Sequence, residues 1–127
     1  MTGRLKIAVA DDEVDTREYL QEYLAHLGHD VRAAADGRAL VELCRAFGPD
    51  LVVTDYAMPG LNGLAAAAEV NREQRVPVVL ISGRHDAEPR AAVEAHVVAF
   101  LAKPIKSAEL KATVESVATG MALRETG

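Results

Sequence analysis

The stretch Leu51-Val52-Val53-Thr54-Asp55-Tyr56-Ala57-Met58-Pro59-Gly60 decides the fold of this chain. It joins a short β-branched apolar run to one carboxylate and then to a Pro-Gly breaker. The apolar run predicts a strand buried on both faces, and Pro59-Gly60 ends regular structure. Because a carboxylate is costly inside a core and ordinary at a strand end, Asp55 is expected where a central strand leaves the core.

Length and composition narrow the class of protein. The chain has 127 residues, the usual size of one domain, and half of them are hydrophobic. The net charge of -5 and the scattered basic residues argue against a nucleic-acid-binding face. One cysteine excludes an internal disulfide, and Cys44 is predicted to be a small core residue. No apolar run reaches membrane-spanning length and no signal peptide is recognisable, so we expect a soluble, cytoplasmic protein with no membrane partner.

Predicted strands and helices alternate along the chain with short connections. Strands are predicted at residues 5–10, 31–34, the run ending at Asp55, 77–81 and 97–102. The helix boundaries rest on capping residues. Predicted helices begin at Asp15, Asp36-Gly37, Asn62-Gly63, Asp86 and Ser107, and those with clear stops end at Gly28, Gly48-Pro49 and about Gln74.

This alternation predicts an α/β fold with an open, mostly parallel sheet and helices on both faces. We expect one domain over residues 1–127, with an ordered core of about 5–119 and a fraying tail at 120–127. In such sheets, ligands bind at the carboxyl ends of the strands, where the strand order reverses. The residues with useful chemistry fall at that edge of the sheet: Asp11, Asp12, Asp55, Ser82 and Lys103.

The acidic residues at this edge predict a cation site. If the first and third strands are neighbours, three carboxylates crowd together. Two unit charges about 4 Å apart repel by about 4 kcal/mol at an effective dielectric constant near 20. A proton, a cation or a metal must therefore neutralise them, and oxygen-only ligands favour Mg²⁺, with Mn²⁺ as an alternative. Lys103 and Ser82 would add a positive charge and a hydroxyl donor, a combination that suits a phosphoryl group.

Each of these signals is weak alone. An acidic pair before a helix is usually a solvated turn with a cap, and Ser-Gly after a strand is usually only a turn. Their joint placement at one edge of the sheet carries the argument.

The sequence resembles a response-regulator receiver domain, the phosphoacceptor half of two-component signalling, from Lys6 to about Thr119. The matching pieces are Val9-Ala10-Asp11-Asp12-Glu13, Asp55-Tyr56-Ala57-Met58-Pro59-Gly60-Leu61-Asn62-Gly63, Ser82-Gly83 and Lys103-Pro104. The resemblance implies a doubly wound, flavodoxin-like fold with five parallel strands in the order 2-1-3-4-5.

The resemblance also implies roles for the residues at the sheet edge. Asp55 would accept a phosphoryl group from a phosphohistidine on a histidine kinase or a histidine phosphotransfer protein. Asp12, Asp55 and the backbone carbonyl of Ala57 would bind Mg²⁺, with Asp11 acting through water. Lys103 and Ser82 would bind phosphoryl oxygens. The Lys103-Pro104 peptide bond would be cis, which proline tolerates.

Further positions bear on switching and on the lifetime of the phosphorylated state. Phe100 falls at the family's aromatic switch position, from which a change would reach the surface of the fourth helix, fifth strand and fifth helix. A core aromatic is the alternative interpretation, and Phe100 has no hydroxyl to fix an inward position. Ala57 and Arg84 occupy the two positions that set the dephosphorylation rate, and Ala57 cannot position an attacking water.

The sequence therefore predicts a phosphorylation-controlled switch, not a turnover enzyme, that acts on an unknown protein target and not directly on nucleic acid. Two alternatives remain. One is a receiver-like adaptor that is not phosphorylated. The other is a Mg²⁺-dependent phosphohydrolase with an aspartyl-phosphate intermediate, which would need a second acid where Ala57 stands.

Overall fold

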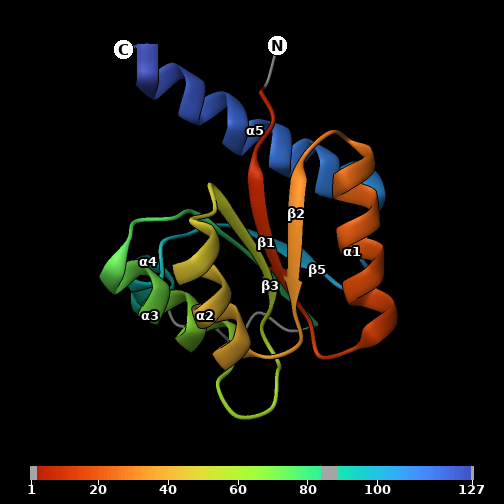
Figure 1. Cartoon of the computed structure of the whole chain (residues 1–127), viewed down its shortest axis with the longest axis vertical. Helices are drawn as coiled ribbons and strands as arrows, with labels where there is room; N and C mark the ends of the chain where they lie inside the picture. The colour runs from red at the N-terminus through yellow and green to blue at the C-terminus, as the bar shows by residue number, and fades with distance from the viewer. Residues whose placement is uncertain (1–2, 84–88, 127) are drawn as a thin grey trace.

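The computed structural model describes residues 3–83 and 89–126, and it forms a five-stranded parallel sheet between two layers of helices (Figure 1). The strands are β1 (Lys6–Ala10), β2 (Asp30–Ala34), β3 (Leu51–Asp55), β4 (Val78–Ser82) and β5 (Val97–Ala102). The helices are α1 (Val14–His26), α2 (Gly37–Phe47), α3 (Gly63–Glu73), α4 (Pro89–Glu94) and α5 (Ser107–Thr126). The strand order is β2-β1-β3-β4-β5 with every pair parallel, which confirms the predicted topology.

Two apolar clusters cover the two faces of the sheet. Helices α1 and α5 lie on one face, and α2, α3 and α4 lie on the other (Figure 1). Within β1, Ile7 and Val9 pack toward α1 and α5, whereas Ala8 and Ala10 pack toward α2 and α3. Strands β3 and β4 alternate in the same way and are fully buried. Burial on both faces explains why these strands read as continuous apolar runs.

Two helices begin where the capping residues predict. The Asp36 side chain accepts a hydrogen bond from the Ala39 N–H, and the Asn62 side chain accepts one from the Ala65 N–H. The predicted stops are also confirmed, because Gly28 and Gly48 adopt φ angles of 103° and 63°, a region that favours glycine.

The prediction that Asp15 caps the first helix is wrong. Helix α1 begins at Val14, and Glu13 holds the capping position with an extended backbone. The carboxylate of Asp11 accepts a hydrogen bond from the Glu13 N–H at 2.9 Å. This bond holds Glu13 in place, so the capping position falls two residues before Asp15. Asp15 instead lies in the first turn, where a negative charge favours the helix dipole.

The last helix differs from the prediction at both ends. Ser107 was predicted to cap this helix from the position just before it, but Ser107 is the first helical residue, because the first helical hydrogen bond runs from the Leu110 N–H to the Lys106 carbonyl. The helix continues to Thr126, past Thr119, where the ordered core was expected to end. Gly120 weakens a helix by only about 1 kcal/mol relative to alanine, which is not enough by itself to end the helix.

The predicted helix start at Asp86 lies outside the described residues, and α4 is seen from Pro89. None of the described helices is both long and apolar enough to cross a membrane.

Candidate functional site

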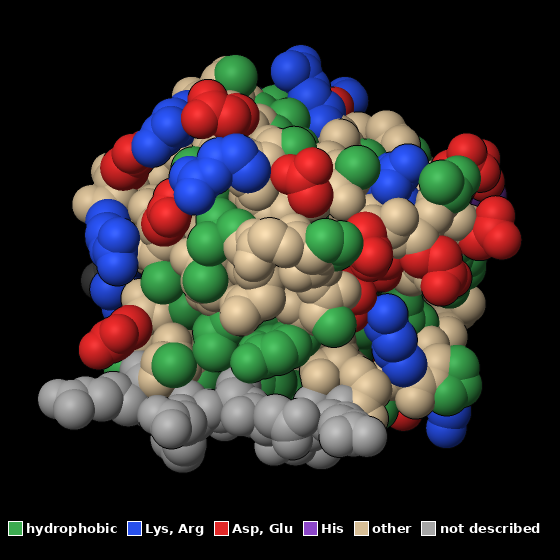
Figure 2. Space-filling view, turned by 90° about the horizontal axis from the view of Figure 1, so that it is seen from below, with side chains coloured by type: hydrophobic (Ala, Val, Ile, Leu, Met, Phe, Trp, Pro, Cys, Tyr) green, Lys and Arg blue, Asp and Glu red, His purple; other side chains and the backbone are tan. Residues whose placement is uncertain are grey.

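The strand register brings the acidic residues together. In the β1–β3 pair, Ala10 lies opposite Thr54, so the next residues, Asp11 and Asp55, leave the sheet side by side. Figure 2 looks onto this end of the molecule from below, and acidic side chains gather there beside apolar ones. One carboxylate oxygen each from Asp11, Asp12 and Asp55 lies within 4.8 Å of the other two. The predicted carboxylate cluster is thus present in the fold.

Burial makes this cluster electrostatically unfavourable on its own. Asp11 is 0% exposed and Asp55 is 3% exposed, whereas Asp12 is exposed. Burial raises the pKa of the Asp11 carboxyl above its usual value. The hydrogen bond from Glu13 and the charge of Lys103 lower it, while repulsion from Asp55 and Asp12 adds to the increase. The edge of the sheet therefore needs positive charge.

Lys103 supplies a positive charge from the end of β5. Its ammonium nitrogen lies 3.1 Å from Asp55 Oδ1 and 3.8 Å from Asp11 Oδ2. Burial lowers the pKa of Lys103, but the hydrogen bond to Asp55 and the charges of Asp55, Asp11 and Glu13 outweigh that effect and raise it overall. The peptide bond between Lys103 and Pro104 is cis.

The cluster also offers a carboxylate oxygen that a metal cation could bind. Asp11 Oδ1 accepts the Glu13 N–H, but the buried Oδ2 has no hydrogen-bond partner among the described residues. At 3.8 Å, Lys103 is too distant to donate to it. A buried carboxylate oxygen without a donor, next to two more carboxylates, fits a hard cation such as Mg²⁺.

The other predicted site residues surround the cluster at different depths. Ser82 is 9% exposed at the end of β4, and its carbonyl accepts the Lys103 N–H at 3.3 Å. Ala57 is exposed in the loop after β3. Phe100 lies within β5 opposite Leu80 and is 42% exposed, so its ring does not occupy a core position. Arg84 lies outside the described residues.

A glycine lets the start of α3 approach the strand that carries Asp55. The Gly63 N–H donates to the Tyr56 carbonyl at 2.8 Å. A Cβ at Gly63 would overlap the Asp55 carbonyl oxygen, so only glycine fits this contact.

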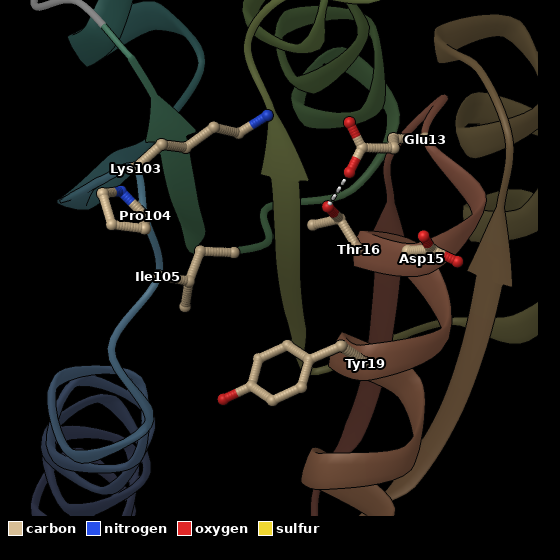
Figure 3. A pocket seen from close by; sticks show the side chains of 7 residues that line it. All are labelled: Glu13, Asp15, Thr16, Tyr19, Lys103, Pro104 and Ile105. Atoms are coloured by element: carbon tan, nitrogen blue, oxygen red, sulfur yellow. Dashed lines mark hydrogen bonds between the residues drawn. The ribbon is translucent and has the colours of Figure 1, made fainter.

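A groove that was not predicted from the sequence lies beside the acidic cluster. It has a volume of about 440 Å³ and runs between α1 and the segment that joins β5 to α5 (Figure 3). Its lining residues are Glu13, Asp15, Thr16, Tyr19, Lys103, Pro104 and Ile105. No local sequence pattern predicts such a groove, because its two walls come from opposite ends of the chain.

Two side chains of α1 that the sequence did not single out also contact the site region. The Arg17 guanidinium donates to the backbone carbonyl of Asp11 at 2.9 Å. The Tyr19 hydroxyl forms a hydrogen bond of 2.6 Å with the Ser107 hydroxyl, 88 residues away. Helix α1 is therefore bonded both to the acidic loop and to the first residue of α5.

Known proteins show the same sequence pattern. One similar protein is a "Probable transcriptional regulator ycf27" from Porphyridium aerugineum, 34% identical over 113 residues, which cover 88% of this chain and 47% of that protein. Another is "Protein-glutamate methylesterase/protein-glutamine glutaminase 4" from Geobacter metallireducens, 39% identical over 106 residues, or 79% of this chain and 30% of that protein. The chain spans about half or less of the length of these relatives.

Solved structures share the fold. The N-terminal domain of an uncharacterized protein from Wolinella succinogenes has a TM-score of 0.83 at 30% identity and covers 94% of this chain and 98% of that chain. NtrX from Brucella abortus has a TM-score of 0.84 at 31% identity, covering 98% of this chain and 29% of that chain. Residues 7–115 match the family described as the response regulator receiver domain. With its parallel sheet and its carboxylate cluster, the chain belongs to the response regulator receiver domain family, the regulatory part of two-component systems.

Proposed function

We propose that this chain is a phosphorylation-dependent switch in which Asp55 accepts a phosphoryl group from a phosphohistidine. The donor would be a histidine kinase or a histidine phosphotransfer protein. One observation carries the proposal: Asp55 is 3% exposed and lies 3.1 Å from the Lys103 ammonium, inside a cluster of three carboxylates. A carboxylate that faces a fixed cation can receive a phosphoryl group whose negative charge is neutralised on arrival.

In the proposed transfer, a carboxylate oxygen of Asp55 forms a bond to phosphorus while the P–N bond to the donor histidine breaks. The electron pair of the P–N bond stays on the imidazole, which leaves and takes up a proton from water. Lys103, and the hydroxyl of Ser82, would bind phosphoryl oxygens after the transfer. Asp12, Asp55 and the Ala57 carbonyl would hold Mg²⁺, with Asp11 acting through water. When bound, Mg²⁺ supplies charge neutralisation at the phosphoryl oxygens.

The proposed output is a change in the surface that α4, β5 and α5 form, which a partner protein would recognise. Support comes from the position of Phe100 on β5, where this residue is 42% exposed on the surface that would change. Taking such a switch from 1:99 to 99:1 needs about 5.5 kcal/mol of differential stabilisation, which the contacts of Ser82 and Lys103 to the phosphoryl group would have to supply.

A phosphohydrolase fits less well, because the exposed Ala57 offers no acid–base group beside Asp55. We also propose that the protein is located in the cytoplasm.

The test is an amide NMR titration with beryllofluoride, which mimics a phosphoryl group on a carboxylate, in the presence of Mg²⁺. We expect shifts at Asp55, Ser82 and Lys103 that spread to Phe100 and α5. They should vanish in Asp55→Asn and persist in Asp30→Asn, a matched change at the opposite end of the sheet. A wild-type protein that gives no shifts would contradict the proposal and favour the adaptor.

A further inference from the structure

We propose that Tyr19 is a positioning residue for the phosphoryl site, although it does not touch Asp55. Its hydroxyl holds the segment from Lys103 to Lys106, and thereby the Lys103 ammonium, against the acidic cluster. The proposal rests on the function proposed above, because it concerns how that site is held in place.

The first step is the contact between α1 and α5. The hydroxyls of Tyr19 and Ser107 lie 2.6 Å apart, a short hydrogen bond. The Tyr23 hydroxyl donates to the Ser107 carbonyl at 3.3 Å, and the two tyrosine rings stack with centroids 5.7 Å apart and planes 7° from parallel. Stacking limits the motion of Tyr19, so its hydroxyl stands at a defined position on α1.

The segment before Ser107 is anchored at both ends. At one end, the Lys103 N–H donates to the Ser82 carbonyl at 3.3 Å. At the other end, Ser107 is bonded to α1. Between these two anchors, Pro104 and Ile105 line the groove of about 440 Å³ that separates the segment from α1. In Figure 3 the Tyr19 side chain reaches across the mouth of this groove toward α5.

The anchored segment carries Lys103, whose position matters for phosphoryl binding. The Lys103 side chain is 35% exposed and its ammonium lies 3.1 Å from Asp55, so a small displacement of its backbone would break the ion pair. A misplacement of about 1 Å can cost as much as a hundredfold in a reaction that depends on positioning. Asp11 and Asp12, in contrast, follow β1, and Asp55 ends β3, so the pairing of these two strands places the three acids. Loosening the segment should therefore weaken phosphoryl binding without weakening the binding of a cation by the three acids.

The experiment measures two affinities, for Mg²⁺ alone and for beryllofluoride at saturating Mg²⁺, by amide NMR. The variants are Tyr19→Phe and Ser107→Ala, which each remove one hydroxyl, and the double variant. Ser116→Ala, an exposed serine on the same helix, is the matched control. We expect beryllofluoride affinity to fall about two- to tenfold in each single variant, the range of one hydrogen bond. Mg²⁺ affinity should stay the same or rise, because a displaced Lys103 ammonium competes less with the metal.

The double variant should be no weaker than either single variant, because both lose the same bond. Equal beryllofluoride affinity in wild type and Tyr19→Phe would overturn the proposal, as would an equal loss of Mg²⁺ affinity, which marks a general structural effect. Failure of the wild type to bind beryllofluoride would instead overturn the proposed function on which this inference rests.

Discussion

The ammonium nitrogen of Lys103 lies 3.1 Å from Oδ1 of Asp55, the carboxylate at the end of the central strand β3. Asp55 ends β3 and Lys103 follows β5, and these two strands are not neighbours, since β4 lies between them. The Lys103 side chain thus reaches past β4 to its partner. Among the ion pairs of the described residues, those of Lys103 alone bring a positive charge to the buried acids Asp11 and Asp55.

Lysine and a metal cation should compete for the same negative charge. We expect Lys103→Met to bind Mg²⁺ more tightly, by roughly tenfold or about 1.4 kcal/mol, because a neighbouring positive charge is gone. The same variant should bind beryllofluoride more weakly, since the cation that faces the phosphoryl oxygens is lost. NMR titrations measure both affinities. Lys106→Met, which removes an exposed lysine nearby, should change neither; a parallel rise or fall of both affinities in Lys103→Met would contradict this account.

The close approach of α3 to Asp55 can be tested with one methyl group. Gly63→Ala should lower the free energy of unfolding by about 1–3 kcal/mol and reduce beryllofluoride affinity, because the new Cβ overlaps the Asp55 carbonyl. Gly37→Ala is the comparison: its Cβ overlaps the Leu61 carbonyl, so stability should fall while the affinity changes less. Urea unfolding and the beryllofluoride titration measure the two effects, and equal losses of affinity would argue against a specific contact at Asp55.

Asn71 joins three segments through its side-chain amide. The amide nitrogen donates to the carbonyls of Ala67 and Ala95 at 3.0 and 3.1 Å, and its oxygen accepts the Val76 N–H at 2.8 Å. Asn71→Ala should lower the free energy of unfolding by about 2–3 kcal/mol, because part-buried backbone groups lose their partners.

The comparison for Asn71→Ala is Asn62→Ala, which loses a single capping bond and should cost about 1 kcal/mol. Urea unfolding should show a lower midpoint with an unchanged slope in both variants. If Asn71→Ala lowers the free energy of unfolding no more than Asn62→Ala does, the hydrogen bonds of the Asn71 side chain contribute little to stability.

His29 should make stability depend on pH. Burial lowers its pKa below the ordinary value of 6.5, with the charge of Glu115 opposing, and Nδ1 accepts the Leu5 N–H at 3.0 Å. Because the unfolded chain then binds the proton more tightly than the folded chain, the contribution of neutral His29 is complete above about pH 6.5 and declines as the pH falls below that value.

Urea unfolding at pH 8 and pH 5.5 checks this effect. The loss of stability at the lower pH should be smaller in His29→Gln than in wild type. His26→Gln, which replaces an exposed histidine on α1, should behave like wild type. If His29→Gln keeps the full pH dependence, other groups are responsible.

The sequence sufficed where structure follows from neighbours along the chain. The runs before Asp55 and Ser82 are apolar without interruption because both faces of their strands are covered, and parallel strands of that kind must present their carboxyl ends together. Asp36 and Asn62 cap helices through a backbone N–H only three residues away. Such local bonds leave a clear pattern in the sequence.

The sequence did not suffice where a side chain has a choice between partners, whether these lie near it or far away in the chain. Asp11 accepts the Glu13 N–H and moves the start of α1, so Asp15 never becomes the cap. Ser107 gives its hydroxyl to Tyr19 across 88 residues. The groove has the same origin, since no residue on one wall reveals what the other wall contributes.

The carboxylate cluster has a consequence for folding itself. Asp11 and Asp55 lie far apart in the unfolded chain and meet only when β1 and β3 pair, so they repel each other in the folded state alone. A divalent cation that binds the cluster and not the unfolded chain shifts the equilibrium by mass action, by about 2.7 kcal/mol at 100 times its dissociation constant. The ionic composition of the surrounding solution would then help to decide how much of the protein is folded.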